Sequence, residues 1–482
     1  MWPRALALAS LVLVCVVALV PAYKLRQPDP FAYRASIAAL LDGRLVLDTA
    51  QYRSLDSRLK KVDDGWHSNI GIVQWTTTPS GAHVSEKNPG YAWWAAPFAA
   101  VGVVRLAPVA ALLIGCAGLW LAGRRWLGEW GGAFTVALFC GSGTLVTMLH
   151  EAYMPSATEA ALLAGGAGLV TWALLDERGG RRAVAGGALG FLLLGAVVTV
   201  RYTAVAVLAV LAATAVAWVL RRASPLRFRW LALWAAAGAV GPALSLVYDQ
   251  LVYGAPLRTG YTQGVTFSVG AVARNLRTVP LGLLLGMPVA LLAAAGVLWA
   301  VTNAVRARAA RGGEAERSAA DGSRGPGAAA GSPRRDLAVA GSLLAWWLAV
   351  WLMYLAYDWT TIVRPSMSYP LFSRFYLPAL GALALLGALP LTRLPRRAAV
   401  PVAAGLLALG VAAGAYSISG DWLYGHGASP VTPRPGMPLP GAPGGMPPGA
   451  MPPGGPPPGT MPPGGMPSGA PPPGGMPSGA PS

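Results

Sequence analysis

Long apolar runs separated by short polar gaps dominate this chain of 482 residues. Hydrophobic residues make up 54% of it and charged residues only 12%, whereas a soluble protein carries about 25% charged residues. Eleven runs have the length of a membrane-spanning helix: 5–22, 104–122, 130–148, 157–175, 183–200, 203–220, 230–250, 279–301, 337–357, 375–392 and 398–417. The pattern predicts an all-α membrane protein built from a bundle of about 11 transmembrane helices.

The first run, within "MWPRALALASLVLVCVVALVPAY", resembles a secretory signal peptide, with one Arg before an apolar stretch. It is long for the apolar region of a signal peptide, which spans roughly 7–15 residues. The residues after it contain no clear Ala-x-Ala cleavage site. We therefore expect an uncleaved first span.

The formal net charge is +18, but the basic residues do not indicate nucleic-acid binding. They lie mainly in every second gap between the apolar runs. Examples are the short gaps that contain Arg124 and Arg181, and the longer stretch 302–336. This is the pattern of the positive-inside rule, whereas a nucleic-acid binder gathers its basic residues on a folded polar domain. The asymmetry predicts a cytoplasmic N-terminus and, after eleven spans, an outer C-terminus.

Three segments differ from the transmembrane domain predicted over 1–417. The long polar segment 23–92 is expected outside, with one or two helices on the membrane surface. The stretch 302–336 lacks periodicity and predicts a flexible cytoplasmic loop. Residues 418–482 form a Pro/Gly/Met-rich tail that predicts disorder, because it offers little apolar surface to bury. The tail is interpreted as a spacer, with a partner-binding role left open.

Acidic residues on the predicted outer side are the first candidates for chemistry. Asp29, just after the first span, is suited to act as a general base on an acceptor hydroxyl, or to begin a helix. Glu159 lies in the first turn of a span, where a carboxylate is costly unless it serves a function or the helix N-terminus stabilises it. Glu151 lies just before it. The polar and ionisable side chains gather on the predicted outer side. This disfavours a transporter, which needs ionisable groups near the membrane midplane.

Three cations converge on the same predicted face. Lys87 follows Glu86 in "SEKNPGYAWWAAPF", Arg201 lies in "VVTVRYTAVAV", and Arg374 begins "RFYLPALGALAL". Lys and Arg are the usual phosphate-binding side chains. The partner of each is either a lipid headgroup or the phosphate of a lipid-linked substrate.

Other reactive residue types carry less information. Cys15, Cys116 and Cys140 lie inside apolar runs and predict neither a disulfide framework nor a metal site. His83 and His150 lie near acids on the predicted outer side, which leaves acid–base or metal roles open, but the four histidines show no metal-binding spacing and both are more typical of polar loop residues. The sequence does not indicate whether a divalent metal is needed.

Taken together, these stretches resemble the GT-C membrane glycosyltransferases, the class that includes protein O-mannosyltransferases and lipid A aminoarabinose transferases. "DPFAYRASIAALLDGRLVL" is similar to the start of the first outer loop, and "EKNPGYAWWAAPF" to its closing motif. "VVTVRYTAV" resembles the mid-chain Arg, while "YDQLVYGAPLRTGY" and "SRFYLPAL" look like later outer-face signatures of bacterial, especially actinobacterial, members. The resemblance covers 1–417. Pro30 and Asn88 depart from it, standing where many members have an acid and a proline.

The resemblance implies a polyprenyl-phosphate-linked sugar as donor, used on the outer side of a bacterial plasma membrane. It also implies that Asp29 is the general base, that Lys87 contacts the donor phosphate, and that Glu159, with Glu151 in reserve, is the second acid. The expected site is completed by Arg201 and Arg374 at the phosphate, and by sugar or acceptor contacts from the following residues: Glu86, Tyr33, His83 and Tyr202.

The sequence therefore predicts an inverting glycosyltransferase that acts on an envelope glycan, lipid or protein in contact with membrane lipid. Two alternatives stay open at this point. One is a non-catalytic scaffold of the same fold in envelope assembly, and the other is a lipid or solute transporter.

Overall fold

The computed structural model describes residues 2–19, 28–61, 71–78, 80–176, 180–221, 227–260, 267–321, 333–357 and 373–418. Most of these residues are helical. Within these ranges, nine helices are long and apolar enough to cross a membrane. The predicted helical multi-pass membrane protein is thereby confirmed. The predicted disordered tail, from residue 419 onward, lies outside the described residues.

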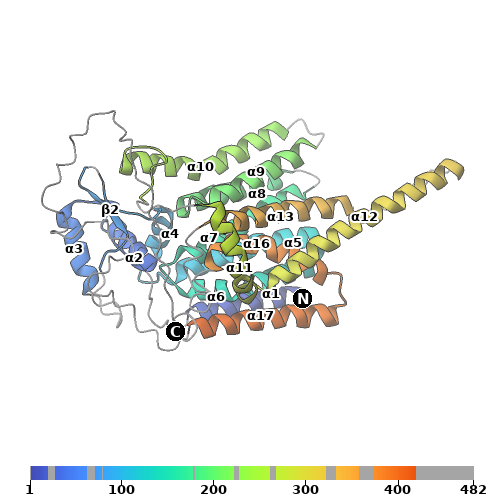
Figure 1. Cartoon of the computed structure of the whole chain (residues 1–482), viewed down its shortest axis with the longest axis horizontal. Helices are drawn as coiled ribbons and strands as arrows, with labels where there is room; N and C mark the ends of the chain where they lie inside the picture. The colour runs from blue at the N-terminus through green and yellow to red at the C-terminus, as the bar shows by residue number, and fades with distance from the viewer. Residues whose placement is uncertain are drawn as a thin grey trace, which may run out of the picture. The chain divides into compact units, whose positions relative to one another are not determined.

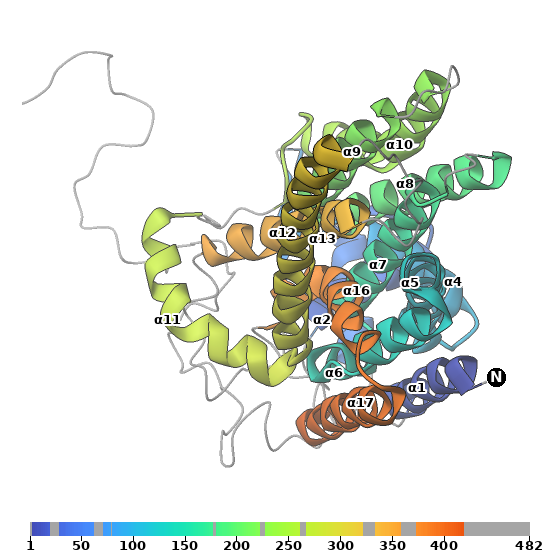
Figure 2. The same ribbon diagram turned by 90° about the vertical axis from the view of Figure 1, so that its right-hand side faces the viewer.

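Most helices of the bundle run side by side in Figure 1, with α11 (Val269–Gly286) lying across them, and are seen closer to end-on in Figure 2. The other helices of the bundle are α1 (Trp2–Leu19), α5 (Leu106–Cys140), α6 (Gly143–His150), α7 (Pro155–Leu174), α8 (Arg181–Val200), α9 (Ala204–Leu220), α10 (Arg227–Tyr253), α12 (Val289–Asp321), α13 (Pro333–Leu355), the 3-10 helix η1 (Arg374–Ala379), α16 (Leu380–Leu391) and α17 (Arg396–Ile418). The most buried spans are α7 and the segment of η1 and α16. Glycines let backbones meet here, as where Gly118 of α5 faces Gly165 of α7.

Two predicted spans, 104–122 and 130–148, begin on the two limbs of α5, which fold back on each other: a Cβ on Gly132 would lie 3.1 Å from the carbonyl oxygen of Trp120. They share α5, which is kinked at Gly128, where φ is 81°. Glycine adopts this left-handed conformation without the Cβ clash that other residues meet. The second predicted span then breaks at Ser142, whose hydroxyl accepts the N–H of Leu145 and so begins α6. Because the two limbs form one continuous element and α9 has 17 residues, the described part has nine long apolar helices where eleven spans were expected.

The predicted span 279–301 is also interrupted, because α11 ends at Gly286 and α12 begins at Val289. Pro288 lies in the break, and a proline has no N–H to continue a helix. The helix α12 then continues to Asp321, well into the stretch 302–336 that was expected to be a flexible loop. Its many Ala, Arg and Glu residues are strong helix formers, so local propensity outweighs the missing apolar period.

The segment between α1 and α5 contains the expected helices and a small sheet. Its elements are α2 (Pro28–Leu41), β1 (Val46–Leu47), α3 (Thr49–Lys60), β2 (Trp75–Thr77), β3 (His83–Ser85) and α4 (Gly90–Ala100). The strands are antiparallel in the order β1-β3-β2, with Val84 opposite Val46 and Thr76. Figure 1 shows α2, α3, α4 and β2 together at one end of the helix bundle. Strands of two or three residues leave too short an alternation to be predicted from sequence.

The chain passes from this sheet to the bundle through the four residues 86–89. Gly90 then begins α4 directly against the backbone of Thr199 at the end of α8, where any Cβ would collide. The Asn88 amide donates to the Val198 carbonyl at 3.5 Å. The turn that contains Lys87 is therefore fixed against the end of a membrane-spanning helix.

Candidate active site

Asp29 lies in the first turn of α2 and faces two cations. Its Oδ1 lies 3.0 Å from Lys87 Nζ, and its Oδ2 accepts a hydrogen bond from Arg374 Nη2 at 2.8 Å. These three residues, called the Asp29 cluster below, come from positions separated by as many as 345 residues. The structure thus brings together the predicted base and two of the three predicted phosphate-binding cations.

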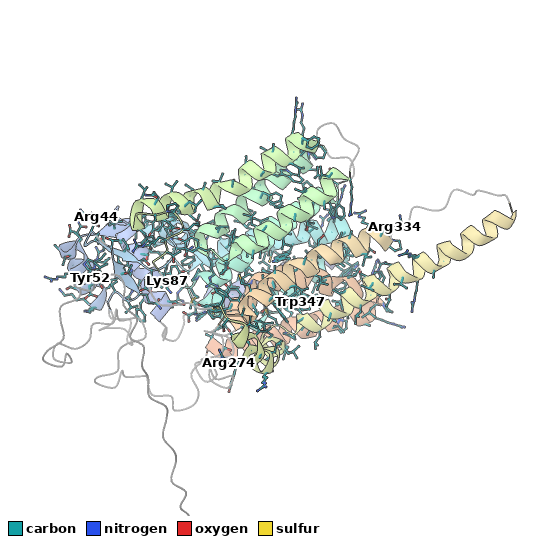
Figure 3. The ribbon with its side chains drawn as sticks, turned by 45° about the horizontal axis from the view of Figure 1, so that its top comes forward. Arg44, Tyr52, Lys87, Arg274, Arg334 and Trp347 are labelled. Carbon is teal, nitrogen blue, oxygen red and sulfur yellow. The ribbon has the colours of Figure 1, made fainter. Side chains whose placement is uncertain are left out.

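The Asp29 cluster is mostly sequestered from solvent. The Lys87, Arg374 and Asp29 side chains are 9%, 10% and 19% exposed. Figure 3 shows Lys87 where the segment between α1 and α5 meets the helix bundle. Because water screens these charges poorly here, their interactions are stronger than those of surface ion pairs.

The surrounding charges hold the Asp29 carboxyl in its ionised form. Burial by itself would raise the pKa of Asp29, but the positive charges of Lys87, Arg374 and Arg201 outweigh it and hold the pKa well below its ordinary value. Asp29 is therefore a weak proton acceptor while both cations remain on it.

Arg201 and Glu159, called the Glu159 pair below, form a second buried ion pair. Arg201 follows the last residue of α8, and its Nη1 lies 3.0 Å from Glu159 Oε2 in the first turns of α7. The Glu159 side chain is only 1% exposed. This contact accounts for a carboxylate inside a span, since a buried charge needs a partner of opposite sign.

Phe375 connects the two groups of charges. The guanidinium of Arg374 lies 4.9 Å from the Phe375 ring centroid, and that of Arg201 lies 5.7 Å from it. Both distances lie within the range of cation–π attraction. One aromatic ring therefore contacts an arginine from each group of charges, and the sequence offered no reason to select Phe375.

Glu86 and Glu151 flank the Asp29 cluster and differ from Asp29 in protonation. Burial raises the pKa of Glu86, although neighbouring Lys87 lowers it. Burial also raises the pKa of Glu151, to about 8, against the lowering effect of Arg374. Glu151 Oε2 is buried and has no hydrogen-bond partner among the described residues. Both acids thus retain a proton at higher pH than Asp29 does.

Tyr33 is buried on α2, one turn after Asp29. Its ring meets that of Tyr91 edge to face, with centroids 5.3 Å apart. The Tyr91 hydroxyl donates to the carbonyl of Ala152, next to Glu151. Tyr33 therefore helps to dock α2, and with it Asp29, onto α4 and the loop before α7.

His83 and Tyr202 were expected to contact sugar or acceptor, but their observed partners lie elsewhere. His83 of β3 stacks on Tyr52 of α3 with ring centroids 4.3 Å apart, beside the small sheet. The Tyr202 hydroxyl donates to Asp249 Oδ1 of α10 at 2.6 Å. The packing of α3 and α10 directs both residues to these other partners.

The part of the chain that the structure describes contains no group of three or more His, Cys, Asp or Glu side chains able to hold a metal ion. His150 is buried at the end of α6. Cys116 and Cys140 lie with their sulfurs 3.9 Å apart inside the bundle.

No protein-family model matches the sequence, and no curated protein matches it. Among solved structures, the chain is similar to the apo oligosaccharyltransferase of Archaeoglobus fulgidus, with 12% identity and a TM-score of 0.49 over 88% of this chain and 56% of that one. It is also similar to ArnT of Cupriavidus metallidurans bound to undecaprenyl phosphate, with 17% identity and a TM-score of 0.48 over 85% of this chain and 62% of that one. The chain thus spans a little over half the length of these proteins.

Proposed function

We propose that this protein is a membrane glycosyltransferase that transfers a sugar from a polyprenyl-phosphate donor to an envelope acceptor on the outer face of the bacterial plasma membrane. One observation carries the proposal: Lys87 and Arg374 converge on Asp29 beside a bundle of membrane-spanning helices. A base for the acceptor and cations for a departing phosphate are what this reaction needs, and the donor's lipid tail requires a site at the bilayer.

In the proposed reaction, an acceptor hydroxyl attacks the anomeric carbon of the sugar from the face opposite the phosphate, which inverts that carbon. The hydroxyl proton passes to the Asp29 carboxylate as the new glycosidic bond forms. The bond between the anomeric carbon and the phosphate oxygen breaks, and its electron pair stays on the phosphate. Lys87 and Arg374 stabilise the negative charge that develops there, and the product is polyprenyl phosphate.

The Glu159 pair has a supporting role in this proposal. Glu159 holds Arg201 at 3.0 Å, and Arg201 lies over the same Phe375 ring as Arg374. Arg201 thereby adds positive potential near the phosphate subsite. Glu86 and Glu151 are proposed to form hydrogen bonds with sugar or acceptor hydroxyls.

Incubation of the purified full chain with a panel of polyprenyl-phosphate sugars tests the function directly. Release of free polyprenyl phosphate, with transfer of the sugar to an added acceptor or to water, is the expected result. A sugar-free polyprenyl phosphate serves as the control. Failure to release polyprenyl phosphate from every member of the panel, by a protein that remains folded, would count against the proposed function.

The proposed orientation has its own test. Arg44 is exposed next to β1 in the outer segment, as Figure 3 shows, so a cysteine at this position should react with a membrane-impermeant maleimide added to intact cells. A cysteine that replaces Arg124, near the kink of α5, should react only after the cells are broken. The reverse pattern would place the Asp29 cluster on the cytoplasmic side.

A further inference from the structure

Each oxygen of the Asp29 carboxylate is held by a different cation. Lys87 Nζ meets Oδ1 at 3.0 Å and Arg374 Nη2 meets Oδ2 at 2.8 Å. A carboxylate and a phosphate both present oxygens in a fork, and the same cations bind either group. The Asp29 carboxylate therefore has the charge and the shape of the group that these cations are proposed to bind.

We propose that Asp29 occupies the donor-phosphate subsite of the donor-free protein, and that the donor phosphate displaces it from Lys87 and Arg374. This inference rests on the proposed function, since it assumes that the ligand carries a phosphate. It assigns Asp29 two successive roles, as a substitute anion first and as a proton acceptor afterwards.

The exchange of anions explains how a carboxylate held by two cations can serve as a base. When the phosphate takes both cations, Asp29 loses the charges that stabilise its ionised form, and its affinity for a proton rises. The donor thus switches on the base, and the acceptor is deprotonated only in a site that already holds the donor.

The exchange also provides a route for product release. After transfer, Asp29 carries the acceptor's proton and is neutral, so it does not compete for the cations. Loss of that proton to water restores the carboxylate, which then competes with polyprenyl phosphate for Lys87 and Arg374. The order that follows is donor binding, transfer, proton loss and product release.

Binding of farnesyl phosphate, a short polyprenyl phosphate, separates this role from a purely structural one. The full chain in detergent is titrated with it by isothermal titration calorimetry, with farnesol as the uncharged control ligand. Asp29→Asn removes the competing anion and keeps the side-chain volume, so it should bind farnesyl phosphate about tenfold more tightly than the wild type, or better, as expected for loss of competition from a charge-assisted contact. Asp42→Asn, which removes the acid of the exposed Asp42–Arg58 pair, should leave the affinity unchanged.

The binding results distinguish a failure of the proposed anion exchange from a failure of the proposed function. If the wild type binds farnesyl phosphate no better than farnesol, both the proposed function and this inference are contradicted. If the wild type prefers the phosphate but Asp29→Asn binds it equally or more weakly, only the inference fails, and Asp29 serves to position the cations for the phosphate.

A second pair of variants covers the case in which Asp29→Asn does not fold, because it leaves two cations close together. Lys87→Gln is then compared with Lys87→Gln/Asp29→Asn, where one charge of each sign has been removed. The double variant should bind farnesyl phosphate more tightly than Lys87→Gln alone. Equal or weaker binding by the double variant would overturn the proposal.

Discussion

The Asp29 cluster and the Glu159 pair both contact the ring of Phe375, yet they differ in composition and burial. In the Asp29 cluster two cations share one carboxylate, and the three side chains are 9–19% exposed. In the Glu159 pair one arginine meets one carboxylate, and Glu159 is 1% exposed. Phe375 contacts both Arg374 and Arg201.

This difference indicates a division of labour. A carboxylate shared by two partly accessible cations can exchange with an incoming anion, because the cations keep equivalent partners after the exchange. A one-to-one pair around an almost fully buried carboxylate cannot open without leaving a charge buried, which costs about 3–5 kcal/mol. We therefore interpret the Asp29 cluster as the reactive site and the Glu159 pair as its support, and the following experiments test that distinction.

Asp29→Asn should have the largest effect on activity. Loss of a general base lowers the rate about 10²–10⁴-fold, so sugar transfer should fall by at least 10²-fold while helicity by circular dichroism stays unchanged. Asp42→Asn, on an exposed ion pair of the same outer segment, is the matched control and should keep its activity. A fully active Asp29→Asn enzyme would contradict the assignment of the base.

Glu159→Gln should mainly affect stability. It removes the carboxylate paired with Arg201 inside a span, and breaking a buried ion pair costs about 3–5 kcal/mol. Thermal unfolding in detergent should show a marked loss, larger than that of Lys87→Gln, and the double variant Glu159→Gln/Arg201→Gln should recover part of it. If Lys87→Gln were the more destabilising change, the two groups of charges would have the opposite roles.

Lys87→Gln should raise the apparent KM for the donor more than it lowers kcat, if the lysine mainly binds the ground-state phosphate. A charge-assisted hydrogen bond contributes about 1.5–3 kcal/mol, so donor affinity should fall about tenfold to 100-fold. Lys60→Gln, which alters an exposed pair with Asp56, is the control. An unchanged donor affinity in Lys87→Gln would remove this residue from the phosphate subsite.

The stability of the folded protein should decrease as the pH rises from about 5 to above 8. Burial raises the pKa of Glu151 from 4.5 to about 8, so between these values the folded protein holds a proton that the unfolded chain has lost. Raising the pH removes that proton and leaves a buried charge, which destabilises the folded state. Thermal unfolding of Glu151→Gln should show less pH dependence than that of the wild type, and identical pH profiles would contradict the assignment.

The smallest effect is expected at His83. Its ring stacks on Tyr52 and its observed contacts lie beside the small sheet, so His83→Gln should change sugar transfer by less than about threefold. A loss comparable to that of Lys87→Gln would return His83 to the site and require the sheet to move toward the Asp29 cluster during the reaction.

Several parts of this structure follow from local patterns in the chain. Apolar runs long enough to span a bilayer predicted the helices, because a backbone in lipid must satisfy its own hydrogen bonds. The same patterns misplaced the breaks at Ser142 and Pro288 and predicted a loop where α12 continues to Asp321. Breaks and extensions depend on capping groups and helix propensity, which are weak signals beside hydrophobicity.

The candidate site divides in the same way. Lys87, Arg201 and Arg374 were identified because cations at the outer ends of apolar runs need anionic partners. Which anion each one meets could not be inferred, since Asp29 and Arg374 are 345 residues apart in the chain. For the same reason the sequence did not predict that Phe375 contacts two arginines, or that Tyr202 bonds to Asp249 of α10.

The sequence alone determined a helical membrane protein with a long polar segment between its first two spans, and it singled out acids and cations as candidates for the site, because hydrophobicity and charge act through local composition. Only the tertiary structure decided that two cations share the Asp29 carboxylate, that Glu159 is committed to Arg201, and that His83 belongs to the small sheet. Those pairings depend on which helices pack together, and packing is decided by the shapes of surfaces that lie far apart along the chain.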